Sequence, residues 1–186
     1  GHPLPNVKIR IVDESFNDLP EQTVGEIAVQ SDCMLTEYYN RPDATEAVIK
    51  NGWYLTGDYG YVANGELYVS GRKKDLIIVG GKNVYPQDLE SLANEVPGVH
   101  AGRTVAFGMY DEEEGTEEVV IIAEADSQDP AEQEAIADAI RKHVTKSSAI
   151  ALRHVKVVDD KWIIKTSSGK TARSANKEKF LKEISQ

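Results

Sequence analysis

The apolar residues change their spacing near residue 75, and this change constrains the fold more than any other feature of the sequence. Before Asp75, short extended runs alternate with turn residues, a pattern typical of short antiparallel strands. These runs are Val7 to Val12, Val24 to Val29 and Leu67 to Ser70. A helix is indicated only at 41–50, with Asp43 or Thr45 as the predicted cap.

After Asp75, helices alternate with strands. Pro86 predicts the first turn of a helix that ends at Pro97-Gly98, and Pro130 opens a second one. The predicted apolar faces are Leu89, Leu92, Ala93 and Val96 in the first helix, Ile136, Ala139, Ile140 and Val144 in the second, and Phe180, Leu181 and Ile184 in a closing helix. The predicted strands are Leu76 to Val79, Thr104 to Met109, Glu118 to Ala125, Leu152 to Val158 and Trp162 to Lys165.

This order predicts an α+β fold with a boundary near Arg72 to Asp75. We expect two domains, a small antiparallel β subdomain at 1–73 and a mixed domain at 74–186. A chain of 186 residues with 40% hydrophobic content can fill a core. The chain opens abruptly on an extended segment, which is typical of a fragment.

Charge and cysteine content limit the classes of partner and the cellular compartment that we expect for this protein. A net charge of −10 argues against nucleic acid or an anionic membrane, because both require a basic face. The residues between 161 and 182 reverse this balance and form a basic end, where a polyphosphate is best held, although solvated charges are the simpler interpretation for most of them.

The single Cys33 excludes an internal disulfide framework and fits a reducing cytoplasm. No apolar run predicts a membrane span, and no signal peptide is indicated.

Asp58 and Arg72 are candidates for contacts with a nucleotide. Asp58 follows Thr56-Gly57, predicted as a tight turn, and a carboxylate there can accept hydrogen bonds from two ribose hydroxyls. The Arg72 guanidinium lies at the end of a predicted strand and can fork onto ribose or phosphate oxygens. Taken singly, each residue is more simply explained as an ordinary turn Asp and a strand-end salt bridge.

The segment Thr166-Ser167-Ser168-Gly169-Lys170-Thr171 resembles a phosphate loop but lacks one residue of the pattern. A Walker loop needs Gly five positions before Gly169, and Ile164 stands there. We therefore interpret the segment as a mobile loop of small residues that carries one ammonium, Lys170. A point charge suits attack on a phosphoryl group, which requires charge neutralisation more than proton transfer. A solvated lysine is the plain alternative.

The remaining candidates are weaker. The histidines have no ligand spacing that predicts a metal site, so we expect none. Gly80-Gly81 is either a simple turn or a place where a thin thiol-bearing arm passes close to the backbone.

Taken together, these motifs resemble the C-terminal part of the adenylate-forming superfamily, which includes acyl-CoA synthetases, fatty acyl-AMP ligases, luciferases and the adenylation domains of peptide synthetases. The resemblance spans nearly the whole chain. Its blocks are Gly25-Glu26-Ile27, Tyr39-Asn40-Arg41-Pro42, Gly52 to Asp58, Gly71 to Glu90 and Lys170. Within them, Gly71-Arg72-Lys73-Lys74-Asp75-Leu76-Ile77 is highly specific.

The resemblance implies the tail of a large N-terminal domain followed by a mobile C-terminal α+β domain that swings about a hinge at Lys74. It implies that Asp58 and Arg72 hold the ATP ribose, that Lys170 is the catalytic lysine, and that Gly81 lines a pantetheine tunnel. The implied reaction joins a carboxylic acid, expected to be a fatty acid, to AMP and then passes the acyl group to CoA or to the phosphopantetheine of a carrier protein.

The same resemblance implies what this chain lacks. The ATP phosphate loop, the Glu that holds Mg²⁺ and the acyl pocket belong to the N-terminal adenylation domain, so we expect the fragment alone to be inactive. Ile164 replaces the Pro usual two positions before the Thr of the closing loop, which affects how that loop is braced. A non-catalytic nucleotide-binding or interaction module that kept the fold is the main rival, and a P-loop NTPase is disfavoured by Ile164.

Overall fold

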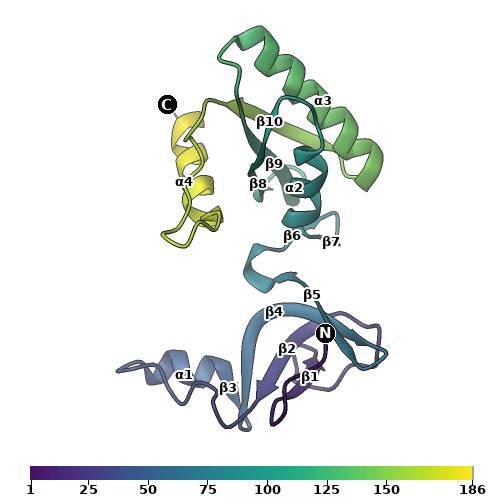
Figure 1. The fold of residues 1–186 in the computed structure, drawn as a ribbon, viewed down its shortest axis with the longest axis vertical. Coiled ribbons are helices and arrows are strands. Elements are labelled where there is room, and N and C mark those ends of the chain that lie inside the picture. The colour runs from purple at the N-terminus through teal and green to yellow at the C-terminus, as the bar shows by residue number, and fades with distance from the viewer. Residues whose placement is uncertain (186) are drawn as a thin grey trace. The chain divides into compact units, whose positions relative to one another are not determined.

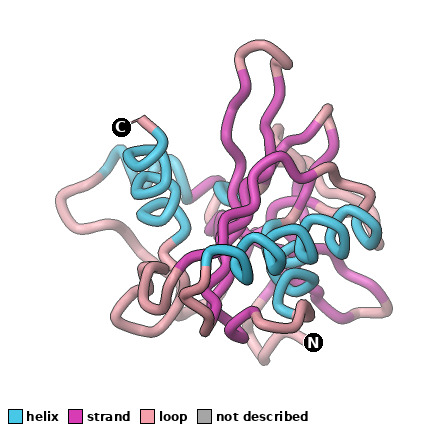
Figure 2. The backbone as a smooth tube through the Cα atoms, turned by 90° about the horizontal axis from the view of Figure 1, so that it is seen from above, coloured by secondary structure: helices cyan, strands magenta, loops and turns pink. Residues whose placement is uncertain are grey.

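The computed structural model describes residues 1–185 and divides into two compact units, Gly1–Lys74 and Asp75–Gln186. The sequence placed this division one residue earlier, between residues 73 and 74. Figure 1 colours the chain from its N-terminus to its C-terminus, and Figure 2 shows loop segments joining the strands and helices of both units. Each unit has its own sheet and is described separately below.

The first unit is an antiparallel sheet. Its strands are β1 (Lys8–Val12), β2 (Gly25–Gln30), β3 (Ile49–Lys50), β4 (Trp53–Ala63) and β5 (Glu66–Arg72), in the order β1-β2-β4-β3 with β5 pairing β4. The long strand β4 therefore pairs with three others, β2, β3 and β5. A side chain at Gly60 is excluded here, because its Cβ would lie 2.3 Å from the carbonyl oxygen of Tyr68 on β5.

The helix of this unit, α1 (Pro42–Val48), is shorter than predicted, and its predicted cap is wrong. Arg41 occupies the N-cap without a side-chain hydrogen bond, and Pro42 supplies the first turn, where its missing N–H costs nothing. Thr45 instead closes the loop before the helix, since its Oγ1 accepts from the Tyr38 amide and donates to the Arg41 carbonyl.

The second unit is α+β, as predicted. The 3₁₀ turn η1 (Lys73–Asp75) contains the division between the two units. The second unit then has a hairpin of β6 (Ile77–Val79) and β7 (Lys82–Val84), and a sheet of β8 (Val99–Asp111), β9 (Thr116–Ala125) and β10 (Leu152–Val158). Strand β9 pairs antiparallel with β8 and parallel with β10. The helices are α2 (Pro86–Asn94), α3 (Pro130–Ser148) and α4 (Arg173–Ile184), and α3 provides the crossover that a parallel pair requires.

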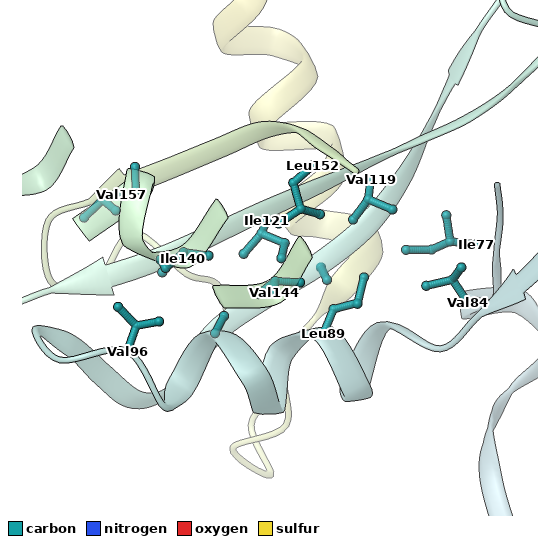
Figure 3. Packing of buried hydrophobic residues seen from close by; sticks show 14 of the residues in the cluster. Ile77, Val84, Leu89, Val96, Val119, Ile121, Ile140, Val144, Leu152 and Val157 are labelled. Carbon is teal, nitrogen blue, oxygen red and sulfur yellow. The ribbon is translucent and has the colours of Figure 1, made fainter. Parts of the chain in front are cut away.

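The sheet of the second unit is covered on both faces. Alternate residues of β9 point to opposite sides: Ile121 lies in a cluster with Leu89 of α2 and Ile140 of α3, whereas Ile122 lies in a cluster with Phe180 of α4. Figure 1 shows α2 and α3 on one side of the sheet and α4 on the other, and Figure 3 shows the first cluster from close by. Burial on both faces explains the uninterrupted apolar run 119–123 in the middle of β9.

Several details of the second unit differ from the sequence prediction. Strand β7 was missed, and the expected strand Trp162 to Lys165 is only an isolated bridge between Lys165 and Thr171. On α3, Ala137 is buried together with Ile140 and Val144, and the predicted Ala139 is exposed. The helix α2 ends at Asn94, so Val96 joins the core from the turn that follows.

No helix within residues 1–185 is both long enough and apolar enough to cross a membrane.

Candidate functional site

The first candidate site is a carboxylate and a guanidinium held side by side on neighbouring strands. Asp58 on β4 lies directly opposite Arg72 on β5 in the antiparallel register. Arg72 Nε lies 3.3 Å from Asp58 Oδ1, and 60% of the Arg72 side chain and 33% of the Asp58 side chain remain exposed. Both groups therefore retain hydrogen-bonding capacity toward solvent, as two contacts to a polar ligand require.

A bulge, and not the predicted turn, presents Asp58. Between the pairs Glu26–Tyr59 and Ala28–Leu55 the register of β2 and β4 shifts, so Thr56, Gly57 and Asp58 lie in a bulge of β4. Gly57 has φ +73°, a conformation that favours glycine. The Thr56 hydroxyl fixes the bulge, since Oγ1 donates to the Ile27 carbonyl and accepts from the Asp58 amide.

Tyrosine and lysine side chains surround this pair within the first unit. A hydrogen bond with Tyr38 raises the pKa of Tyr54 above its ordinary value, and partial burial and the Asp58 charge add to the effect. Lys73, next to Arg72, donates to Glu26 Oε2 at 2.9 Å, and this hydrogen bond raises the pKa of Lys73. Lys73 is therefore anchored to the sheet.

The second candidate site is the loop that carries Lys170. Its backbone closes on itself, because the Thr166 amide donates to the Lys170 carbonyl at 2.8 Å and the Gly169 amide donates to the Thr166 carbonyl at 2.8 Å. Gly169 has φ +79°, which allows this tight closure. The Lys170 side chain is exposed, and Nζ has no hydrogen-bond or ion-pair partner within residues 1–185. Among the described residues, the loop therefore presents the Lys170 ammonium without a partner, on a backbone closed by its own hydrogen bonds.

Arg173, three residues after Lys170, belongs to the basic end, where solvated charges were the expectation for most residues, and it is an exception. Its guanidinium contacts Asp75 Oδ2 at 2.8 Å, Glu90 Oε1 at 2.6 Å and the Ala106 carbonyl at 2.8 Å. Only 18% of the Arg173 side chain is exposed. No sequence pattern pointed to this residue, because its partners come from three other elements.

Lys74 and Gly81 lie at exposed turns. Lys74 is the last residue of the first unit and the middle residue of η1. Gly80 and Gly81 have φ of +54° and +76° and join β6 to β7, so both glycines are required by the turn itself. The turn is also held from β9, where Thr116 Oγ1 accepts from the Gly80 amide at 2.8 Å. A Cβ at Gly81 would meet no atom within 4 Å.

Within residues 1–185, no group of three or more His, Cys, Asp or Glu side chains is placed to hold a metal ion. The histidines pair with single carboxylates at the surface, as in His143–Glu95 at 2.9 Å and His154–Glu118 at 3.1 Å.

Comparison with known proteins gives a consistent group of relatives. No protein-family model matches the chain. It is 34% identical over 183 residues to a putative acyl-CoA synthetase of Caulobacter vibrioides, covering 97% of this chain and 32% of that protein. It is 36% identical over 131 residues to a fatty acid–[acyl-carrier-protein] ligase, ScoC, of Streptomyces coeruleorubidus, covering 70% of this chain and 25% of that protein.

A solved structure agrees with these relatives. The McyG A-PCP structure, complexed with phenylalanyl-adenylate, matches 99% of this chain and 29% of its own with a TM-score of 0.91 and 34% identity. The chain therefore spans about a third or less of the length of each of these proteins.

Proposed function

Because the chain belongs to the adenylate-forming superfamily and corresponds to a C-terminal portion of its enzymes, we propose that it serves an acyl-activating ligase. In this proposal a longer protein contributes an N-terminal adenylation domain. The present chain contributes contacts to the ATP ribose, a hinge and a catalytic lysine. The reaction converts a carboxylic acid and ATP to an acyl-adenylate and pyrophosphate, and then transfers the acyl group to a pantetheine thiol.

The observation that carries this proposal is the Lys170 ammonium on a closed, exposed loop, where it has no hydrogen-bond or ion-pair partner among residues 1–185. In the first half-reaction a carboxylate oxygen attacks the α-phosphorus, a new P–O bond forms, and the bond to pyrophosphate breaks. Two anions meet in this step, so negative charge accumulates around phosphorus. We assign to Lys170 the neutralisation of that charge, which an exposed ammonium without a competing partner is suited to provide.

The pair of Asp58 and Arg72 supports ribose binding. An ionised carboxylate accepts hydrogen bonds only, and a ribose presents two neighbouring hydroxyls that donate. Arg72 at 3.3 Å keeps the carboxylate oriented and adds donors of its own. The Mg²⁺ that accompanies ATP would be held by residues outside this chain.

The hinge and the thiol path are further parts of the proposal. Lys74 is exposed and directly precedes the division between the two compact units, which is where a rotation costs the fewest contacts. The open space at Gly81 is compatible with a pantetheine arm passing the β6–β7 turn. The relatives include enzymes named for CoA and for acyl-carrier protein, and both acceptors present the same thiol arm.

The test of the function is carboxylate-dependent exchange of labelled pyrophosphate into ATP by the full-length protein. We expect exchange with at least one fatty or aromatic carboxylic acid and none without acid. A protein that binds ATP and shows neither exchange nor acyl-hydroxamate formation with any such acid would favour the rival, a non-catalytic nucleotide-binding module.

The ribose assignment predicts a loss of sugar selectivity on replacing Asp58. In the full-length protein, Asp58→Ala should lower kcat/KM for ATP by roughly 10- to 100-fold, the effect of one or two hydrogen bonds to a charged group. The parent should prefer ATP over 2′,3′-dideoxy-ATP, and the variant should lose most of this preference, because the missing hydroxyls are the groups that Asp58 contacts.

Glu66→Gln is the matched control, since Glu66 is an acid at the other end of β5. It should leave both the ATP kinetics and the sugar preference unchanged. If Asp58→Ala keeps the full preference for the hydroxylated sugar, Asp58 does not bind the ribose.

A further inference from the structure

The two ends of the Lys170 loop are fastened to one buried side chain, Asn176 of α4. Asn176 Oδ1 accepts from the Ile164 amide at 2.8 Å. Its Nδ2 donates to the Ile164 carbonyl at 2.9 Å and to the Ala172 carbonyl at 2.9 Å. Ile164 and Ala172 are also joined directly, because the Ala172 amide donates to the Ile164 carbonyl at 3.0 Å. Residues 165–171 therefore leave and return to one fixed point.

The amide of Asn176 is fully used and has a defined orientation. Both Nδ2 hydrogens meet carbonyl oxygens and Oδ1 meets an N–H, so the flipped amide would place like groups against each other at all three contacts. The residue is 0% exposed. Asparagine is an unfavourable choice inside a helix, so its presence in the first turns of α4 indicates a role other than helix formation.

Two other side chains hold the segments that flank the loop. Glu124 of β9 is 0% exposed, and its Oε1 accepts from the Ile163 amide at 2.6 Å. Arg173, directly after Ala172, is held by Asp75 and Glu90. The adjacent amides of residues 163 and 164 thus meet acceptors from two different elements. The Ile164 amide is the group that a proline at this position would lack, and here Asn176 accepts from it.

We propose that Asn176 is a positioning residue for Lys170, an inference that rests on the proposed function. By joining both ends of the loop, Asn176 restricts the volume that the Lys170 ammonium can occupy before any substrate binds. Less conformational freedom then remains to be lost when the ammonium meets the reacting phosphate. Asn176 touches no substrate in this account and acts only through the loop.

The first experiment measures the loop directly, by amide hydrogen exchange of the full-length protein. Asn176→Ala removes all three contacts. Asn176→Asp keeps the size of the side chain and the acceptor for Ile164 but places an oxygen against two carbonyls. Both variants should exchange faster than the parent at Thr166, Gly169 and Lys170. Phe180→Leu, which disturbs the packing of α4 against Phe107 of β8 but keeps the three Asn176 contacts, is the control and should leave these amides unchanged.

The second experiment separates the two half-reactions. Asn176→Ala and Asn176→Asp should slow acyl-adenylate formation by roughly 10²-fold, the cost of a small misplacement of a reacting group. They should leave thioester formation from supplied acyl-adenylate within about twofold of the parent. Phe180→Leu should leave both rates near parental values. The split matters because a general loss of folded protein would lower both rates together.

The outcomes distinguish this inference from the proposed function. If the loop amides of a folded Asn176→Ala protein exchange hydrogen at the parental rate, Asn176 does not hold the loop. Faster loop exchange with a parental rate of adenylation would overturn the positioning role. If the parent itself lacks pyrophosphate exchange, the proposed function fails and the positioning role fails with it, while the hydrogen-exchange result still decides whether Asn176 holds the loop.

Discussion

Replacing Lys170 with Ala in the full-length protein should slow acyl-adenylate formation by about 10³-fold or more, the scale seen when a single charge that stabilises a phosphoryl or oxyanion transition state is removed. No side chain of residues 1–185 forms a hydrogen bond or an ion pair with the Lys170 ammonium, so none of them is paired with it to take over its charge. Pyrophosphate exchange into ATP measures this half-reaction. Thioester formation from supplied acyl-adenylate should be largely spared, because the new bond forms at the carbonyl carbon and not at phosphorus.

Lys182→Ala is the matched control for this prediction. Lys182 is an exposed lysine of α4, so its removal changes the net charge of the unit equally without touching the loop. Parental rates are expected for both half-reactions of the control. An adenylation rate in Lys170→Ala equal to that of the parent would remove Lys170 from the catalytic machinery, and equal losses in the two half-reactions would indicate a structural role.

Replacing Lys74 with Pro should have the opposite effect on the two half-reactions, sparing adenylation and slowing thioester formation. Proline fixes φ near roughly −65°, a value that a 3₁₀ turn such as η1 already uses, and so blocks rotation at this residue. We expect adenylation to be retained and thioester formation to fall by at least about 10²-fold, because in the proposed mechanism the C-terminal unit reorients before the second half-reaction. Single-turnover measurement of each half-reaction on the full-length protein gives the two rates.

Lys74→Ala separates the backbone effect from the side chain. It removes the ammonium and keeps the freedom of φ, so both half-reactions should stay within a few-fold of the parent. If Lys74→Ala reproduces the proline effect, the side chain matters and the rotation does not. If both half-reactions of Lys74→Pro fall together, the swing about this residue is contradicted.

The sequence predicted the elements that depend on local chemistry. Pro86 and the apolar spacing that follows it marked α2, and Pro130 marked α3, because a proline at the first turn and a periodic apolar face are visible in the sequence itself. It missed β7, whose three residues carry no pattern, and it described a turn at Gly57 where β4 contains a bulge. A bulge is defined by its partner strand, so the sequence of one strand does not reveal it.

The candidate site was predictable in part for the same reason. Asp58, Arg72 and Lys170 lie in short recognisable motifs, whereas the contacts of Asn176 and Arg173 are visible only in the fold. Asn176 is a small polar residue in a basic helix, and from the sequence alone it would be taken for an exposed surface residue. Arg173 stands among lysines, and only the fold shows that Asp75 and Glu90 neutralise it.

The contact between Arg173 and Asp75 ties the start of α4 to the residue next to the proposed pivot. Asp75 is the first residue after Lys74, and Arg173 begins the helix that follows the Lys170 loop. With the guanidinium bound to Asp75, the span from the proposed pivot to the start of α4 is held by side chains of the second unit. A rotation about Lys74 would then carry the base of the Lys170 loop along an arc of constant radius, so the angle of the swing would decide which surroundings the loop reaches.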